Sequence, residues 1–294
     1  MAFKMEMEVL RNRRLLWLFV KRDLKLRYAG SILGLFWSVI NPLIMLTIYV
    51  TVIGFILGGG RFVESGDAAI VGRGKEEFAI YLCCGLFSWT CLCECLMGAS
   101  SSILSNASLI KKSVFPIHIL PFQAIASAFV NFFITLILFL ICLAILQFGL
   151  GKPYLSPIAL LLPLLIVFHF LFIVGSCLIV ATLNVFFRDT QQLLNAMLMI
   201  GFWLTPIIYP VDILTRMEEQ PGAEPVSGLF KKGFELWCQI NPCAHLVGLY
   251  QSVFVYFEFP RTGSIIYLLS FGAVTYIIGK YLFTRSQAHF VDDV

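Results

Sequence analysis

The chain has 294 residues, of which 59% are hydrophobic and 13% are charged, and its mean hydropathy is +0.89. Soluble domains contain about 45–50% apolar and about 25% charged residues. The composition therefore excludes a soluble globular enzyme, a disordered protein and a nucleic-acid-binding protein, and it predicts an all-α polytopic membrane protein.

Residues 1–30 are polar and basic, but they contain a short apolar run that includes Trp17. The run is too short to span a bilayer, which takes roughly 20 apolar residues. We expect an amphipathic helix that lies in the membrane interface; the alternative is a cytosolic tail with a hydrophobic anchor. No cleavage site follows, so we expect no signal peptide. The side chains expected to meet lipid headgroups are Arg22, Lys25 and Arg27.

Six apolar segments follow, and each meets the length of a transmembrane helix. They cover approximately residues 31–57, 78–104, 119–148, 158–185, 193–209 and 264–283. We therefore expect six transmembrane helices. The chain then divides into an interface helix (1–30), spans one to five (31–209), an external segment (210–262), and the sixth span with a cytoplasmic tail (263–294).

The positions of Lys and Arg predict the orientation, because cytoplasmic loops carry an excess of both. With both termini in the cytoplasm, the cytoplasmic segments contain 13 of the 21 basic residues. The external segments then contain eight basic and ten acidic residues. This distribution favours cytoplasmic termini and an even number of spans.

The external segment contains the helix-breaking pair Asn241-Pro242. We expect two short re-entrant helices on either side of this break, dipping into the outer leaflet. The alternative is a seventh span after the break, but it would place the C-terminal basic residues outside, against the charge rule. Cys238 and Cys243 flank the break and are candidates for a disulfide, which geometry would decide.

The loop at 105–118 has the sequence signals of a short amphipathic helix. It begins with a Ser-Asn pair that can cap a helix, contains two adjacent lysines and ends at a proline. We expect Ile110 and Phe115 to be exposed and to dock onto a partner. The alternative is an ordinary connector.

The sequence contains no nucleotide-binding loop and no catalytic motif. Gly74-Lys75 is followed by Glu76 and lacks the earlier glycine of a phosphate-binding loop. No HExxH, GxSxG or paired-carboxylate pattern is present. We therefore expect neither catalysis nor a cofactor in this chain.

Two ionisable side chains lie deep in the predicted spans, namely Glu94 and His169. A carboxylate in lipid is costly, so Glu94 either lines a translocation path or is hydrogen bonded as a structural group. We expect His169 to be a packed, hydrogen-bonded residue. The amides expected to form interhelical hydrogen bonds are Asn131, Gln123 and Asn184.

Aromatic residues make up 15% of the chain, and most suit lipid-facing positions or interfacial belts. Aromatic faces also suit the apolar faces of sugar rings. The candidates for lining a channel are Trp37, Tyr49, Phe87, Trp89, Glu94, Phe202, Trp203 and Tyr209. Five of the nine cysteines lie at 83–95, where they are more typical of small packing residues than of metal ligands.

A series of short motifs occurs in a specific order along residues 10–285. They are VKRDLKLRY (20–28), SILGLFW (31–37), Asn41-Pro42-Leu43, residues 106–112 with Phe115-Pro116, Leu120-Pro121, NVFFRD (184–189), TPIIYP (205–210) and Asn241-Pro242. In this order they resemble the membrane subunit of ABC exporters for polysaccharides, of the O-antigen, capsule and teichoic-acid export type. The cysteine-rich second segment with Glu94 departs from that pattern.

The resemblance implies a homodimer of six-span subunits in the cytoplasmic (inner) membrane, with a channel between them. Two copies of a separate ABC ATPase would dock below and would hold ATP and Mg. The substrate would be a glycan linked to polyprenyl pyrophosphate, whose head Arg22, Lys25 and Arg27 could attract. Residues 228–259 would gate the outer mouth. The residues implied in coupling to the ATPase are Ser105, Asn106, Leu109, Ile110, Lys111, Lys112, Phe115, Arg188 and Asp189.

Three other functions share parts of this pattern. An exporter of a lipophilic small molecule or drug would have the same topology. A membrane-embedded glycosyltransferase would need clustered acidic residues in a loop, and a non-transport scaffold would tolerate changes in the 105–115 loop.

Overall fold

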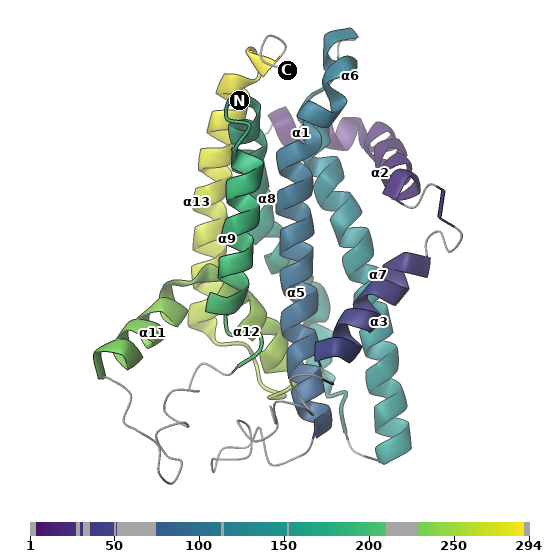
Figure 1. Ribbon diagram of the computed structural model, residues 1–294, viewed down its shortest axis with the longest axis vertical. Helices are drawn as coiled ribbons and strands as arrows, with labels where there is room; N and C mark the ends of the chain where they lie inside the picture. The colour runs from purple at the N-terminus through teal and green to yellow at the C-terminus, as the bar shows by residue number, and fades with distance from the viewer. Residues whose placement is uncertain are drawn as a thin grey trace.

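The structure, a computed structural model, describes residues 4–27, 30–31, 36–49, 51, 75–112, 115–151, 153–209 and 228–290. Throughout these ranges the regular secondary structure is helical and contains no β-strand. Figure 1 shows long helices side by side, with shorter helices at both ends of the bundle. The all-α fold class predicted from composition is confirmed.

Four helices are long and apolar enough to cross a membrane. They are α5 (Lys75–Ser102), α7 (Ile119–Leu150), α8 (Leu162–Phe186, preceded by the 3-10 turn Pro157–Leu161) and α13 (Thr262–Ser286). Their positions match the second, third, fourth and sixth predicted spans. The chain is thus a polytopic membrane protein.

The first and fifth predicted spans coincide with shorter helices, α3 (Trp37–Tyr49) and α9 (Thr190–Leu204). With 13 and 15 residues they extend about 20 and 23 Å, less than the roughly 30 Å of a hydrocarbon core. Part of the first predicted span, at 32–35, 50 and 52–57, lies outside the described residues. A total of six spans therefore stays a prediction.

Helix α5 lies at the centre of the bundle. In its most apolar window 72% of the residues are buried, against 28%, 33% and 17% for the windows of α7, α8 and α13. It contacts α7, α8, α9 and α12 (Pro242–Phe254). The other long helices therefore keep large apolar faces, which suits a lipid environment.

Helices α8 and α13 approach each other closely along a seam of glycines. A Cβ atom built on Gly175 would lie 2.2 Å from the backbone nitrogen of Tyr276, and one on Gly279 would lie 2.6 Å from the carbonyl oxygen of Gly175. Gly272 would meet the carbonyl oxygen of Leu171 at 2.9 Å. Small residues at such positions allow two helix backbones to touch in a membrane.

One end of the bundle gathers all the segments that the charge pattern places in the cytoplasm. Figure 1 shows both ends of the chain there, together with α1 (Lys4–Arg11), α2 (Arg13–Arg27) and α6 (Ala107–Lys112). The short turn Leu104–Asn106 joins α5 to α6, and the turn between α8 and α9 also lies at this end. Helices α11 (Gly228–Ile240) and α12 lie at the opposite end.

The predicted break at Asn241-Pro242 separates α11 from α12. The side chain of Asn241 accepts a hydrogen bond from the backbone nitrogen of Cys243 at 2.9 Å, so it caps α12, and the proline occupies the first turn. The same amide donates to the hydroxyl of Thr205 at 3.0 Å. The helix break thereby fixes this junction against the end of α9.

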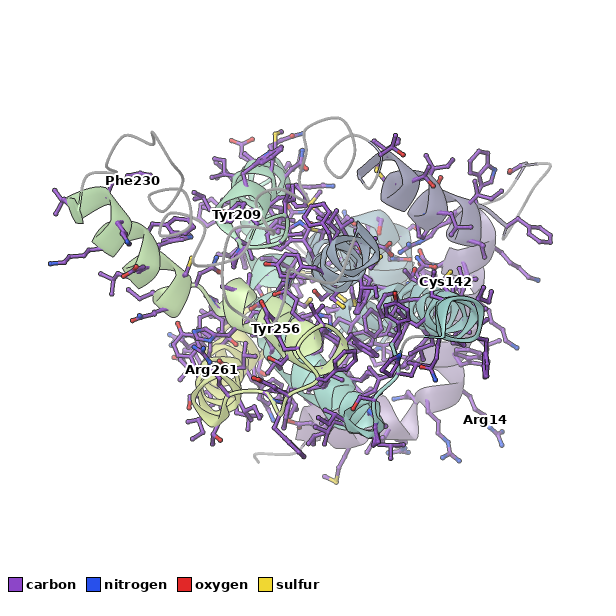
Figure 2. All side chains as sticks on the ribbon, turned by 90° about the horizontal axis from the view of Figure 1, so that it is seen from below. Arg14, Cys142, Tyr209, Phe230, Tyr256 and Arg261 are labelled. Carbon is purple, nitrogen blue, oxygen red and sulfur yellow. The ribbon has the colours of Figure 1, made fainter. Side chains whose placement is uncertain are left out.

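Helix α11 projects from the side of the bundle with a largely exposed apolar surface. Leu229 and Phe230 are 84% and 61% exposed. Figure 2, a view from the end that holds α11, shows Phe230 on the far side of the molecule from Cys142 of α7. The re-entrant, external placement of these helices remains a prediction.

Candidate functional site

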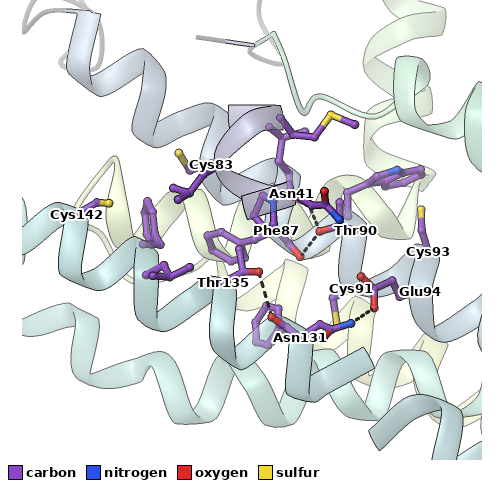
Figure 3. Close-up of a pocket in the computed structure, with 18 of the residues that line it drawn as sticks. Asn41, Cys83, Phe87, Thr90, Cys91, Cys93, Glu94, Asn131, Thr135 and Cys142 are labelled. Carbon is purple, nitrogen blue, oxygen red and sulfur yellow. Dashed lines mark hydrogen bonds between the residues drawn. The ribbon is translucent and has the colours of Figure 1, made fainter. Parts of the chain in front are cut away.

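A cavity of about 810 Å³ lies between α3, α5, α7 and the end of α9 (Figure 3). Helix α5 contributes residues from Ala79 to Glu94, and α7 contributes residues from Ala128 to Leu146. On α7 the lining positions recur every three or four residues, which places them on one face of the helix. The volume falls within the range of small-molecule sites.

The cavity ends in a small polar network around Glu94. Its Oε2 atom accepts hydrogen bonds from Asn131 Nδ2 at 2.8 Å and from Arg27 Nη1 at 3.1 Å. Figure 3 shows Asn131 reaching across from α7 towards Glu94 on α5. The Arg27 guanidinium also donates from Nε to Asp23 at 3.2 Å. One cation at the end of α2 therefore meets two carboxylates.

The Arg27–Glu94 ion pair is only partly screened from solvent, with side chains 31% and 38% exposed. Pairs of this kind contribute little to stability in water. Their importance here is positional, because the pair connects the interface helix α2 to the wall of the cavity. Both alternatives for Glu94, as a path residue and as a hydrogen-bonded structural group, find support in this geometry.

The predicted channel-lining residues fall into two groups. Trp37, Phe87, Trp89, Glu94 and Phe202 line the cavity. Trp203, Tyr209 and Tyr49 do not belong to its lining as described.

Trp203 is 62% exposed, because its neighbour Phe202 faces inwards and successive helical residues point about 100° apart. Tyr209 lies beyond α9 and packs against Phe234 at 5.9 Å between ring centroids. The side chain of Tyr49 lies outside the described residues.

The predicted coupling segment, residues 105–115, is tied directly to the interface helix. Arg22 donates a hydrogen bond to Oδ1 of Asn106 at 2.7 Å, and Asn106 is itself buried. The ring of Phe115 lies 5.4 Å from that of Phe19, over which the Arg22 guanidinium sits at 4.4 Å. The segment and α2 therefore form one contact surface.

The expected exposure of Ile110 is wrong. Its side chain is only 5% exposed and belongs to the hydrophobic core, and Phe115 is half-buried. A short amphipathic helix gains more by burying its apolar face against the bundle than by presenting it to water. Among the residues of this segment whose side chains are described, the exposed ones are all polar, namely Ser105, Ser108 and Lys111.

The remaining predicted contact residues are solvent-accessible where the structure describes them. Arg188 and Asp189 are exposed in the turn between α8 and α9, and Lys25 is exposed on α2. Leu109 is half-buried. The side chain of Lys112 lies outside the described residues.

Helix α1 is attached to α13 and to the start of α7 by polar contacts. Glu6 accepts hydrogen bonds from Lys280 and Tyr276. Burial raises the pKa of Glu6, but these hydrogen bonds outweigh it and hold the pKa below its usual 4.5. Burial lowers the pKa of His118, whose Nε2 lies 3.5 Å from Glu8, against the opposing effect of that carboxylate.

His169 is fully buried, as expected of a packed residue. Its Nδ1 is 3.0 Å from the hydroxyl of Tyr250, and the rings of Phe129 and Phe132 lie against it. The sequence prediction for His169 is confirmed. No group of three potential metal ligands occurs in the part of the chain that the structure describes.

Two of the three predicted interhelical amides are confirmed. Asn131 bonds to α5 as described above, and Asn184 donates to the carbonyl oxygen of Ser100 at 2.9 Å. Gln123 is different, because its amide donates to the hydroxyl of Ser127 one turn along the same helix. Residues four apart lie on the same helix face, so this partner is within reach without any contact between helices.

The candidate disulfide between Cys238 and Cys243 is not formed, and both thiols are free. They lie on different helices on either side of the break. Burial raises the pKa of Cys238 and brings that of Cys243 to about 12, so both thiols stay protonated at neutral pH.

Several cavity residues were not recognised in the sequence, among them Asn41, Thr90 and Phe139. The recurrence of Asn131, Phe132, Thr135 and Cys142 along α7 was a usable signal. It marks one helix face that carries both aromatic and polar groups. The cavity itself needs four helices, and no local pattern specifies their arrangement.

Comparisons with known proteins agree with this architecture. The sequence pattern of the family described as ABC-2 type transporter matches residues 14–217. The chain is 25% identical over 288 residues to an O-antigen export system permease protein, RfbA, of Myxococcus xanthus, covering 98% of each chain. It is 30% identical over 200 residues to a protein of the same description from Klebsiella pneumoniae, covering 68% of this chain and 70% of the relative.

Proposed function

The chain belongs to the ABC-2 type transporter family as a membrane subunit, not an enzyme, and on this premise we propose that it exports a lipid-linked polysaccharide of the O-antigen kind. The observation that carries the proposal is similarity over nearly the whole chain to one permease named for O-antigen export. That similarity includes the interface helix, the coupling segment and the external helices.

We infer that the functional unit is a homodimer in the cytoplasmic membrane, with both termini cytoplasmic. The charge distribution supports this orientation, and so does the gathering of α1, α2, α6 and the chain ends at one end of the bundle (Figure 1). Two copies of a separate ABC ATPase would dock at that end and supply the energy of ATP hydrolysis.

Motion of the ATPases would reach the membrane through the coupling segment. Its exposed described residues are Ser105, Ser108 and Lys111. Asn106 and Phe115 connect the segment to Arg22 and Phe19 of the interface helix. A rigid-body shift of α6 would therefore move α2, and with α2 the Arg27–Glu94 pair at the cavity.

The proposal is tested by deleting the gene in the organism that carries it. Loss of the surface glycan, with accumulation of the lipid-linked glycan in the cytoplasmic leaflet and recovery by the wild-type gene, is the expected result. An unchanged surface glycan would refute polysaccharide export as the function.

A second candidate is export of a lipophilic small molecule, because the cavity is lined mostly by apolar side chains. It predicts that the deletion strain becomes sensitive to such compounds and retains its surface glycan. The same strain therefore separates the two candidates.

A further inference from the structure

The cavity has the length and chemistry of a site for a hydrocarbon chain. From Ala79 to Glu94 it follows 16 residues of α5, and the 15 rises between them span about 22 Å at 1.5 Å each. Apart from cysteines, only five of its 25 lining residues are polar. A linear apolar chain fits such a space better than a hydrated glycan, whose hydroxyls would lack partners along most of the wall.

The end of the cavity next to α2 has a different character. Among the lining residues that the structure describes, Glu94 alone is charged, and its partner Arg27 reaches it from α2. Asn131 donates to Glu94, which fixes the orientation of the amide, and its Oδ1 is buried without a hydrogen-bond partner.

Glu94 has no other charged partner than Arg27 among the described contacts. A carboxylate within a membrane protein is retained at a cost unless a cation compensates it. Arg27 also binds Asp23, so the guanidinium meets two negative charges before any ligand arrives. A phosphate group, which arginine binds through paired hydrogen bonds, therefore competes with Glu94 for this guanidinium.

We propose that this cavity binds the hydrocarbon chain of a phosphate-bearing amphiphile, and that Glu94 holds the phosphate's place on Arg27 while the cavity is empty. On binding, the phosphate takes the Nη1 hydrogen bond, and Glu94 keeps its hydrogen bond from Asn131. A neutral amphiphile leaves the ion pair intact and gains nothing from Arg27. The site lies within one subunit, between its own α3, α5 and α7.

This inference rests on the proposed function for its choice of ligand chain, since a phosphorylated isoprenoid and a membrane phospholipid share the same chemistry. The test uses the full-length chain in its complex in detergent micelles. Native mass spectrometry measures binding of three probes: a polyprenyl monophosphate, the corresponding polyprenol, and phosphatidylglycerol.

The variants Arg27→Gln, Glu94→Gln and Asp23→Asn separate the possible effects. Arg27→Gln is expected to weaken binding of the polyprenyl phosphate about tenfold or more, and Glu94→Gln to tighten it about threefold or more. Binding of the polyprenol stays unchanged in both. Asp23→Asn is the matched control, because it removes a carboxylate from the same guanidinium outside the cavity, and its effect is expected to be smaller.

Two results would overturn the inference. If Glu94→Gln weakens phosphate binding as Arg27→Gln does, Glu94 positions Arg27 and does not compete with the ligand. If Asp23→Asn tightens binding as much as Glu94→Gln, the loss of any nearby negative charge explains the effect, and Glu94 does not occupy the phosphate position.

The lipid source and the proposed function are judged separately. Preference for phosphatidylglycerol over the polyprenyl phosphate would assign the cavity to a membrane phospholipid. Glycan export by the wild type without binding of either phosphate probe would refute this site and leave the proposed function standing. If the phosphate probes bind with the predicted pattern but deletion of the gene spares the surface glycan, the site would stand and the proposed function would be refuted.

Discussion

Replacing Gly175 by alanine tests the backbone contact that sets the spacing of α8 and α13. The added Cβ would lie 2.2 Å from the nitrogen of Tyr276 and 2.4 Å from the carbonyl carbon of Thr275. Ordinary van der Waals contacts begin at 3.4 Å, so the two helices must separate by roughly 1.2 Å. Both obstacles are backbone atoms, and no side chain can rotate away to relieve the clash.

The expected cost follows from this geometry. Overpacking a well-packed interface costs about 1–3 kcal/mol, and a clash with backbone belongs at the upper end of that range. At about 2–4 °C per kcal/mol, a cost of about 2–3 kcal/mol should lower the melting temperature by about 4–12 °C. Thermal unfolding of the purified protein in one detergent measures this shift.

Gly248→Ala is the matched control. Gly248 lies inside α12, and a Cβ built on it meets no atom within 4 Å. Because alanine favours a helix interior by about 0.5–1 kcal/mol over glycine, this variant should unfold at an equal or slightly higher temperature. A Gly175→Ala protein that unfolds within about 1 °C of the wild type would refute the close approach of α8 and α13.

Three further predictions concern coupling, the buried core and pH. Phe115→Ala removes the ring that lies 5.4 Å from Phe19, and it should leave ATP hydrolysis intact while export is lost; normal export at the wild-type ATPase rate would remove Phe115 from the coupling path. Tyr250→Phe leaves Nδ1 of the fully buried His169 without its hydrogen-bond partner and should lower the free energy of unfolding by about 1–3 kcal/mol, measured by thermal unfolding. Adding His169→Leu should recover part of this loss. A further loss of stability in the double variant would argue against the His169–Tyr250 hydrogen bond. Because the pKa of Glu6 is depressed in the folded state, its ionised carboxylate stabilises the docking of α1 above pH 4.5, and this contribution is lost as the pH falls through the lower, folded-state pKa. Proteolysis of α1 in nanodiscs should therefore increase below that pKa in the wild type. The Glu6→Gln variant should show no such increase with falling pH.

The sequence predicted the parts of the fold that depend on local chemistry. Apolar length identified α5, α7, α8 and α13, and the proline after Asn241 identified the break between α11 and α12. These features need only hydropathy, helix length and capping, which a single segment contains.

Features that depend on packing against another segment could not be predicted from the sequence. Ile110 has the same local pattern whether the short helix turns outwards or inwards, and only the packing of the bundle decides that it is buried. Gln123 likewise has a choice of partners that the sequence does not rank. The close approach at Gly175 also has no local signal, because its obstacle lies about a hundred residues further along the chain.

The candidate site shows the same division. Glu94 and the aromatic residues Trp89 and Phe202 were identified because charge and ring type within a span are unusual or chemically informative. The Arg27–Glu94 contact was not predicted, since it joins residues 67 positions apart on two helices whose arrangement is tertiary. The site is defined only once the three-dimensional structure shows which of these polar groups lie close together.

Co-expression with an ABC ATPase of the same organism, followed by affinity purification from detergent-solubilised membranes, tests the exporter assignment most directly. The predicted result is a stable complex with two copies of each subunit, whose ATPase rate falls when this chain is omitted. Purification of this chain alone, with no ATPase bound and no effect on its hydrolysis rate, would contradict an ATP-driven exporter.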